Sequence, residues 1–221
     1  MASPVFNLDK VSVAYGDESV LHDISLRIDA GEQVVLIGPS GAGKSTLLKK
    51  LYELSAERAA FIHQDYALVP QLSAFHNVYA GRLDQCGVVD NLVNLVRPRP
   101  KDVDQVEPLL AELGLADKLF EPVSELSGGQ QQRVAVARAI YRGSDLVMGD
   151  EPVSAIDPHQ SGTVLDLLKR RAGTLVLAMH DVQLAQGYFD RLVGLRLGRI
   201  VFDRPVEGVD EAILRDLYRP C

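Results

Sequence analysis

The stretch Gly38-Pro-Ser-Gly-Ala-Gly43-Lys44-Ser45 decides the fold, because it matches the pattern G-x-x-x-x-G-K-[ST] in full. It follows Gln33–Ile37, a short apolar run that is typical of a strand buried on both faces. A helix is predicted after it, from about Lys44 to Glu53. Glycines let the backbone N–H groups of such a loop converge on phosphate oxygens, and the helix N-terminus adds partial positive charge. The context therefore predicts a cradle for nucleotide phosphates.

Three side chains at the end of this loop have predicted contacts with a bound nucleotide. Lys44 would neutralise the phosphates, Ser45 would ligate Mg²⁺, and Thr46 would add a further phosphate contact. The backbone contacts are assigned to the loop itself, at Gly38, Pro39, Ser40, Gly41, Ala42 and Gly43. The alternative, a glycine-rich turn that arose by chance, is disfavoured by the strand and the helix on either side.

Two adjacent acids end a second apolar run, Leu146-Val-Met-Gly-Asp150-Glu151. Asp150 is placed to hold Mg²⁺ through its water shell, and Glu151 can polarise the attacking water as a general base. Paired acids at a strand end can instead cap the next helix. Because the same chain carries a complete phosphate loop, the sequence favours the catalytic interpretation.

Strand and helix patterns alternate along the chain, as they do in α/β proteins. Besides Gln33–Ile37, strands are predicted at Phe6–Tyr15, Ser19–Ile28, Leu146–Met148, Thr174–Ala178, Leu192–Leu197 and Arg199–Phe202. From about residue 67 to 142 the pattern is helical, ending in a helix at Gly128–Tyr141, with predicted breaks at Pro98, Pro100, Pro108 and Pro122. We therefore expect one domain over residues 1–221: a parallel-sheet nucleotide core at about 1–66 and 142–221, interrupted by a helical insertion at about 67–141.

The composition limits the class of protein. A formal net charge of -7 argues against a nucleic-acid binder, which would usually be basic. No apolar run approaches the roughly 18 residues that a bilayer span needs, and the first residues lack the pattern of a signal peptide. The short basic run Arg97–Lys101 is interpreted as a solvated loop rather than a binding patch. We expect a cytoplasmic protein with no nucleic-acid partner.

A second glycine-rich turn, Leu126-Ser-Gly-Gly-Gln130, opens the predicted helix Gly128–Tyr141. One nucleotide triphosphate needs only one cradle, so two different cradles suggest that each site is completed by another copy of the chain. At Leu126-Ser-Gly-Gly-Gln-Gln-Gln-Arg133 the chain resembles the nucleotide-binding subunits of ATP-binding cassette (ABC) transporters, nearly end to end. The resemblance implies an α/β P-loop NTPase with a RecA-like core, an inserted ABC helical subdomain and an N-terminal antiparallel β part.

In that family, the signature turn of one subunit closes on the γ-phosphate that the other subunit's phosphate loop holds. The resemblance gives this role to Ser127, Gly128, Gly129 and Gln130, at a helix start that is itself an anion site. Ser127 would also cap the helix, and the two roles do not compete. The resemblance thus implies ATP and Mg²⁺ as ligands and a homodimer that sandwiches two ATP molecules.

Four further residues fall where the family would place them. Tyr15 resembles the aromatic that stacks on adenine, although a tyrosine at a strand end is most often a packing residue. Gln64 resembles the glutamine that senses Mg²⁺ and the attacking water and contacts the membrane partner; the alternative is a surface glutamine. Asp157 resembles the residue of the loop that crosses the dimer interface, and ahead of Pro158 it is also a predicted helix N-cap. His180 resembles the histidine that links γ-phosphate, water and the opposite subunit, although a lone histidine is usually structural.

Outside these motifs, the segments Phe61–Ser73 and Asn77–Leu83 look like the ATPase subunits of phosphonate or phosphite importers. Such a subunit would hydrolyse ATP to power a membrane permease, with a solute-binding protein if the system imports. It would lie on the inner face of the cell membrane. Two alternatives stay open: an exporter ATPase, which shares every catalytic motif, and a subunit that binds ATP with impaired hydrolysis. A soluble ABC protein that acts on ribosomes or DNA is disfavoured by the single acidic cassette.

One departure from the family concerns the segment between Lys44 and Gln64. It has only about twenty residues, where family members usually carry a longer stretch with an extra β-hairpin. Loops and hairpins of this kind can be lost at small thermodynamic cost. We therefore predict a trimmed peripheral sheet with an intact catalytic core. If the hairpin supports Gln64, impaired ATPase activity is expected instead.

Overall fold

Two β-sheets of different size organise the chain, which this computed structural model describes over residues 4–16, 18–55 and 58–219. The strands are β1 Pro4–Tyr15, β2 Glu18–Asp29, β3 Gln33–Ile37, β4 Ala59–Ile62, β5 Leu146–Asp150, β6 Thr174–Ala178, β7 Arg191–Arg196 and β8 Arg199–Pro205. The larger sheet has the order β4-β5-β6-β3-β7-β8, with parallel pairs except between β7 and β8. The smaller sheet pairs β1 with β2 antiparallel. The ends of the predicted domain, residues 1–3 and 220–221, lie outside the described ranges.

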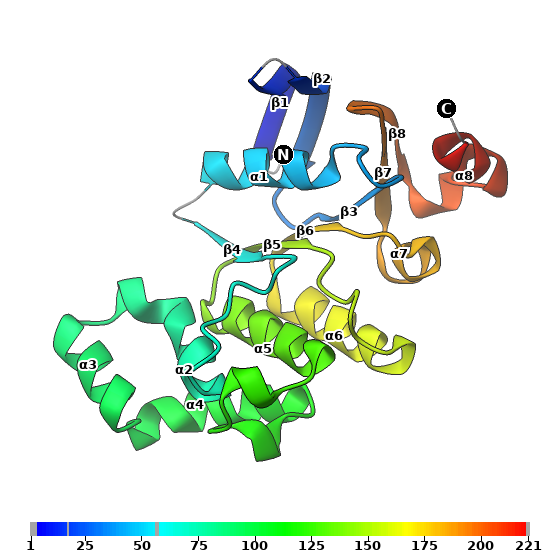
Figure 1. Cartoon of the computed structure of the whole chain (residues 1–221). Helices are drawn as coiled ribbons and strands as arrows, with labels where there is room; N and C mark the ends of the chain where they lie inside the picture. Colours follow the sequence, from blue (N-terminus) through cyan, green and yellow to red (C-terminus); the bar gives the residue numbers. More distant parts are fainter. Residues whose placement is uncertain (1–3, 17, 56–57, 220–221) are drawn as a thin grey trace.

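Helices cover both faces of the larger sheet (Figure 1). They are α1 Lys44–Ser55, α2 Ala74–Tyr79, α3 Val88–Val96, α4 Pro100–Glu112, α5 Gly128–Tyr141, α6 Pro158–Arg171, α7 Val182–Tyr188 and α8 Glu211–Tyr218. α1 lies between the smaller sheet and one face of the larger one, and α5 and α6 lie against the opposite face. α2, α3 and α4 follow β4 and form a helical group beside α5. In the part of the chain that the structure describes, no helix is both long and apolar enough to span a membrane.

The alternation of side chains along β3 explains why the larger sheet borders two cores. Val34 and Leu36 face α1 and the smaller sheet, whereas Val35 and Ile37 face α5 and α6. All four side chains are fully buried. A strand that is covered on both faces is apolar over nearly its whole length. The prediction of a doubly buried strand at Gln33–Ile37 is confirmed.

The smaller sheet is reduced to two strands, as the short segment before Gln64 led us to expect. α1 ends at Ser55 and β4 begins at Ala59, so the connection is too short to hold a hairpin. The inward face of the sheet still packs against α1 through the fully buried Leu21 and Ile24. The trimmed β part therefore keeps an apolar attachment to the core.

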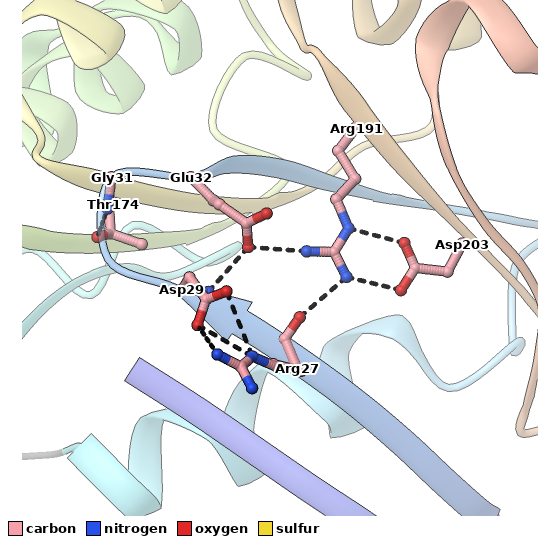
Figure 2. A network of polar contacts seen from close by, with 7 residues as sticks. All are labelled: Arg27, Asp29, Gly31, Glu32, Thr174, Arg191 and Asp203. Carbon is pink, nitrogen blue, oxygen red and sulfur yellow. Dashed lines mark hydrogen bonds and ion pairs between the residues drawn. The ribbon is translucent and has the colours of Figure 1, made fainter. Parts of the chain in front are cut away.

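A charged network also joins the two sheets, at the end of β3 that lies away from the phosphate loop (Figure 2). The guanidinium of Arg191 on β7 donates to both carboxylate oxygens of Asp203 on β8, each at 2.7 Å, and to Glu32 at 2.7 Å. It also donates to the backbone carbonyl of Arg27 on β2 at 2.9 Å. The hydrogen bonds to Asp203 are the main reason that the pKa of Arg191 is raised. One side chain thus ties β2 to β7 and β8.

The predicted strands and helices are confirmed, with boundaries shifted by a few residues. The prediction that Pro108 breaks a helix is wrong, because α4 runs through it. Pro108 lies on the exposed side of α4. Water can therefore hydrate the carbonyl that the proline ring leaves without a backbone donor. Pro100 instead begins the helix, at a position that tolerates a missing N–H.

Candidate active site

Four neighbouring strands end at one edge of the larger sheet and deliver the predicted catalytic residues to it. β4 is followed by Gln64, β5 ends in Asp150 with Glu151 next, β6 is followed by His180, and β3 is followed by the loop Gly38–Gly43. The carboxyl ends of parallel strands meet at one edge, which is where α/β proteins bind ligands. A cavity of about 230 Å³ opens there, lined by Val20, Ser40, Gly41, Ala42, Gly43, Lys44, Ser45, Thr46, Gln64, Glu151 and His180.

The backbone of the phosphate loop has a shape that glycine adopts more readily than other residues. Gly38, Gly41 and Gly43 have positive φ angles of 150°, 76° and 100°. A Cβ atom on Gly38 would lie 2.1 Å from the carbonyl oxygen of Leu195 on β7, and one on Gly43 would lie 2.7 Å from the side chain of Leu21. The glycines therefore let the loop turn tightly against β7 and β2.

Lys44 begins α1 and is almost fully buried, with 5% of its surface exposed. Its ammonium donates hydrogen bonds to the backbone carbonyls of Gly38 at 2.7 Å and Pro39 at 3.1 Å. Burial lowers the pKa of Lys44, while the carboxylates of Glu151 and Asp150 act in the opposite direction. A cation that is removed from water in this way is stabilised by an anion. The loop thus presents it to phosphate oxygens that enter the cavity.

The surroundings of Asp150 fit a magnesium ion. Asp150 is 5% exposed, and its buried Oδ1 atom has no hydrogen-bond partner among the described residues. A buried carboxylate oxygen without a partner is unfavourable unless a cation or water pairs with it. Asp150 is not among the described residues that line the cavity, whereas Ser45 and Gln64 are, and both carry oxygen atoms. Over the described ranges, no three His, Cys, Asp or Glu side chains form a closed metal cluster. Mg²⁺ usually binds through one or two carboxylates, waters and substrate phosphates, and the unpaired oxygen of Asp150 fits the carboxylate part of such a set.

Glu151 and His180 contact each other directly in the wall of the cavity. Nε2 of His180 lies 2.6 Å from Oε1 of Glu151, and the two side chains are 46% and 14% exposed. Glu151 has a left-handed backbone conformation with a φ of 54°, and its N–H donates to the carbonyl of Ala178 at 2.9 Å. Such conformations persist where the surrounding structure fixes them, and they cluster at functional sites. The geometry suits a general base that a histidine orients.

Gln132 is a residue of this region that the sequence analysis did not single out. It lies on α5 and is 1% exposed, and its amide nitrogen donates to the carbonyl of Glu151 at 2.6 Å. Its amide oxygen accepts from the N–H of Ala155 at 2.8 Å. Gln132 thereby connects α5, which begins at the second glycine-rich turn, with the segment that carries Glu151. The sequence signal is a polar residue on a helix face that Ala135 and Ala139 continue, both of them buried.

The second glycine-rich turn begins α5 with a reciprocal cap. The Ser127 hydroxyl accepts from the N–H of Gln130 at 3.3 Å, and the Gln130 side chain accepts from the N–H of Ser127 at 2.8 Å. A Cβ atom on Gly129 would lie 2.7 Å from the carbonyl oxygen of Ala155, so glycine permits the close approach. As far as the described residues go, the lining of the phosphate-loop cavity includes none of residues 127–130. Among the described residues of one chain, the second glycine-rich turn therefore does not border the phosphate-loop cavity.

Tyr15 and Asp157 also stand apart from the cavity lining. Tyr15 ends β1 and is 58% exposed. Asp157 caps α6, because its Oδ1 accepts from the N–H of Gln160 at 3.0 Å, with Pro158 at the first position of the helix. The predicted N-cap role of Asp157 is confirmed. Contacts of Tyr15 and Asp157 with a nucleotide stay predictions.

Comparison with known proteins agrees with this geometry. The family model described as ABC transporter matches residues 21–154. Over 246 aligned positions the chain is 41% identical to the phosphonates import ATP-binding protein PhnC of Pseudomonas putida, covering 98% of this chain and 91% of that protein. The alignment is longer than the 221-residue chain, so it includes positions that the relative has and this chain lacks.

Solved structures give the same result for the fold. The dimeric structure of MJ0796, a bacterial ABC transporter cassette, has a TM-score of 0.77 at 25% identity, over 92% of this chain and 99% of that chain. The dimeric structure of a post-hydrolysis state of that cassette, bound to ADP and Pi, has a TM-score of 0.74 at 25% identity with the same coverage. The similarity extends over almost the whole chain.

Proposed function

The chain belongs to the ABC transporter family and is an ATPase of that family, and we propose that it powers the import of a phosphonate or a similar small oxyanion through a membrane permease. The nearly end-to-end identity of 41% with a phosphonate import protein supports the substrate class and favours import over export. The observation that carries the proposal is the cavity that gathers the phosphate loop with Gln64, Glu151 and His180. That cavity argues against a subunit that only binds ATP.

The proposed nucleotide site lies at the carboxyl ends of the parallel strands of the larger sheet, β3 and β5 among them. The phosphates of ATP would lie in the loop Gly38–Gly43, with Lys44 meeting their charge. Asp150, Ser45 and Gln64 would hold Mg²⁺. When bound, Mg²⁺ neutralises the charge that develops on the phosphates during transfer.

Glu151 is the proposed general base. Its carboxylate would take a proton from the attacking water, while Nε2 of His180, 2.6 Å away, fixes the orientation of the carboxylate. In phosphoryl transfer the protein forms few covalent bonds itself. Positioning of the reactants and stabilisation of charge therefore account for most of the rate enhancement. The buried ammonium of Lys44 contributes to that stabilisation because it acts in a partly desolvated site.

A second copy of the chain completes each site in this proposal. Its residues 127–130 would close on the γ-phosphate, and the loop with Asp157 would cross the interface. Tyr15 of the chain that holds the phosphates would stack on adenine. The separation of the two glycine-rich turns within one chain supports this arrangement. Residues 67–141 would then act as the helical signature subdomain and the remainder as the catalytic core.

α3 presents the surface that we assign to the permease. Its polar residue Asn94 is fully buried and donates to Asp102 at 2.9 Å, so the polar side of the helix faces the protein. Its apolar side faces solvent, with four side chains 64% to 83% exposed: Val88, Val89, Leu92 and Val96. An apolar face of this kind marks a site that a partner covers. Figure 1 shows α3 at the far end of the helical group, away from the smaller sheet. The permease would hold the chain on the inner face of the cell membrane.

A charged substitution on the exposed side of α3 would distinguish permease binding from ATP hydrolysis. The variant Leu92→Asp should hydrolyse ATP at the parent rate when alone, because α3 contributes nothing to the lining of the catalytic cavity. It should fail to co-purify with the permease. Equal recovery of the permease with the variant and with the parent would contradict this assignment.

Two assays on the purified parent test the proposed function in parts. Phosphate release from ATP tests turnover, and its absence would favour a subunit with impaired hydrolysis. Uptake of a radiolabelled phosphonate into proteoliposomes that carry the permease, the chain and the solute-binding protein tests the substrate. Phosphate release without phosphonate uptake would keep the ATPase and overturn the substrate class.

A further inference from the structure

The segment that carries Gln64 forms a tight turn directly after β4. The N–H of Tyr66 donates to the carbonyl of His63 at 3.0 Å and closes the turn, with Gln64 at its tip. Tyr66 and Ala67 then have left-handed backbone conformations, with φ angles of 63° and 46°. Residues other than glycine adopt such conformations at a cost, and they keep them where the surrounding structure fixes them. The turn therefore depends on contacts that hold Tyr66 and Ala67 in place.

Arg138 on α5 supplies such contacts. Its guanidinium donates to the backbone carbonyl of Tyr66 at 2.7 Å and to that of Ala67 at 2.5 Å. Burial lowers the pKa of Arg138, while the carboxylate of Asp65 in the turn acts in the opposite direction. Hydrogen bonds from an ionised donor are stronger than those between neutral groups. One side chain thus holds both residues whose left-handed conformations follow the tip of the turn.

The side chain of Tyr66 makes a second contact with α5, at the first residue of the helix. A Cβ atom on Gly128 would lie 3.9 Å from the Tyr66 hydroxyl oxygen, which is ordinary van der Waals contact. The Tyr66 ring also packs against the core to which α5 contributes. The turn is therefore held against α5 at two places, by Arg138 through backbone carbonyls and by Tyr66 through its side chain.

These contacts bear on the hairpin that this chain lacks. The connection from α1 to β4 is too short to hold a hairpin, yet Gln64 lines the catalytic cavity. Arg138 reaches the turn from α5, on the other side of β4 in the chain, so its contacts do not depend on that connection. They can hold Gln64 at the cavity in the trimmed protein.

We propose that Arg138 is a positioning residue for Gln64, whose hydrogen bonds to the Tyr66 and Ala67 carbonyls keep the Gln64 side chain at the catalytic cavity. The inference rests on the proposed function in that Gln64 acts there on Mg²⁺ and the attacking water. Arg138 is not among the described residues that line the cavity, so it acts through the turn. Without its guanidinium, the turn would spend part of its time in conformations that carry Gln64 out of the cavity.

The first test needs no nucleotide and compares Arg138→Gln with the matched control Arg142→Gln. Arg142 lies four residues further on, and its guanidinium pairs with Asp84 at 3.0 Å instead of the Gln64 turn. The closed turn protects the Tyr66 amide from hydrogen exchange. That amide should exchange about 10-fold faster or more in Arg138→Gln than in the parent, as expected when hydrogen bonds from a charged donor are lost. The control should match the parent.

The second test measures phosphate release from ATP. At saturating Mg²⁺, kcat of Arg138→Gln should fall about 10- to 100-fold, while the Kd for MgATP stays close to the parent value because the phosphate loop is unchanged. The half-saturating Mg²⁺ concentration should rise, since Gln64 is a proposed ligand of the ion. In the Gln64→Ala background, replacing Arg138 should change kcat by less than about 2-fold, because both changes act through one side chain.

A conservative variant guards against a general loss of folding. Arg138→Lys keeps a cation but not the paired donors, so its kcat and its Tyr66 exchange should lie between those of the parent and Arg138→Gln. It carries the same comparisons if Arg138→Gln does not fold.

Two results would overturn the inference. One is an unchanged exchange rate of the Tyr66 amide, and the other is an equal fall in kcat with and without Gln64→Ala, which would leave Arg138 a purely structural role. A parent that releases no phosphate from ATP would instead overturn the proposed function, and the exchange experiment would still report on the turn. The two failures are therefore distinguishable.

Discussion

Glu151 and His180 meet at 2.6 Å in the wall of the cavity, and replacing the glutamate isolates its part in turnover. The variant Glu151→Gln keeps the shape of the side chain but removes the basic oxygen. We expect kcat to fall by about 10²- to 10⁴-fold, which is the usual contribution of a general base, while MgATP still binds. Phosphate release and equilibrium binding measure the two effects, with Glu207→Gln on the exposed surface as the control. Hydrolysis at the parent rate would exclude Glu151 as the base.

Tyr79 gives stability a predictable dependence on pH. Its hydroxyl donates to Asn91 at 3.1 Å, and burial raises its pKa to about 12, above the ordinary value of about 10. Because the folded-state pKa is the higher one, the contribution of Tyr79 to stability is complete below about pH 10 and is lost as the pH rises to about 12. The free energy of unfolding, measured in urea, should fall between pH 9 and pH 11, and it should fall further for the parent than for Tyr79→Phe. An equal fall in the two proteins would show that folding does not raise the pKa of Tyr79.

Single residues were predictable where a motif ties a side chain to its chemistry. Lys44 and Asp150 are examples, because a glycine-rich loop and a strand end fix what they can contact. Gln132 was not predicted, although it hydrogen-bonds to backbone groups of the site. Its partners lie far away in the sequence, and no local pattern shows which backbone group a buried amide meets.

At the scale of elements, Arg191 tests how the trimmed smaller sheet is held (Figure 2). The variant Arg191→Leu leaves Glu32 and Asp203 without their shared cation and frees the Arg27 carbonyl on β2. We expect the free energy of unfolding to fall by about 1–3 kcal/mol, the usual loss when charged partners are left unpaired. Chemical denaturation measures it, with the exposed Arg204→Leu on β8 as the control. An unchanged midpoint would mean that apolar packing alone attaches the smaller sheet.

Elements were predictable where one local pattern decides the outcome. β3 is apolar from Val34 to Ile37 because it is covered on both faces there, and its sequence shows this directly. The helix through Pro108 was missed because the sequence does not show that this side of α4 faces water. The spacing of Val88 and Leu92 on α3 would by itself predict that both side chains are buried. The structure instead buries Asn94 and exposes Val88 and Leu92. Only the tertiary structure decides that orientation.

At the scale of the whole molecule, the order of the strands explains why motifs that are far apart in the sequence form one site. β4, β5, β6 and β3 are neighbours, so the residues after their carboxyl ends meet at one edge. Gln64 lies in the cavity lining although the connection from α1 to β4 has no hairpin. The loss of the hairpin therefore trims the periphery without removing Gln64 from the site. In the proposed dimer, the second glycine-rich turn would complete the site of another copy of the chain.

The state of association of Glu151→Gln with MgATP tests the central claim, that the two glycine-rich turns are halves of one site from different chains. Sedimentation velocity should show a dimer with MgATP and a monomer without it, since nucleotide is bound but not consumed. The additional change Ser127→Arg should keep the chain monomeric with MgATP, because it blocks the turn that closes on the γ-phosphate. A double variant that still binds MgATP and dimerises as fully as Glu151→Gln would contradict the account.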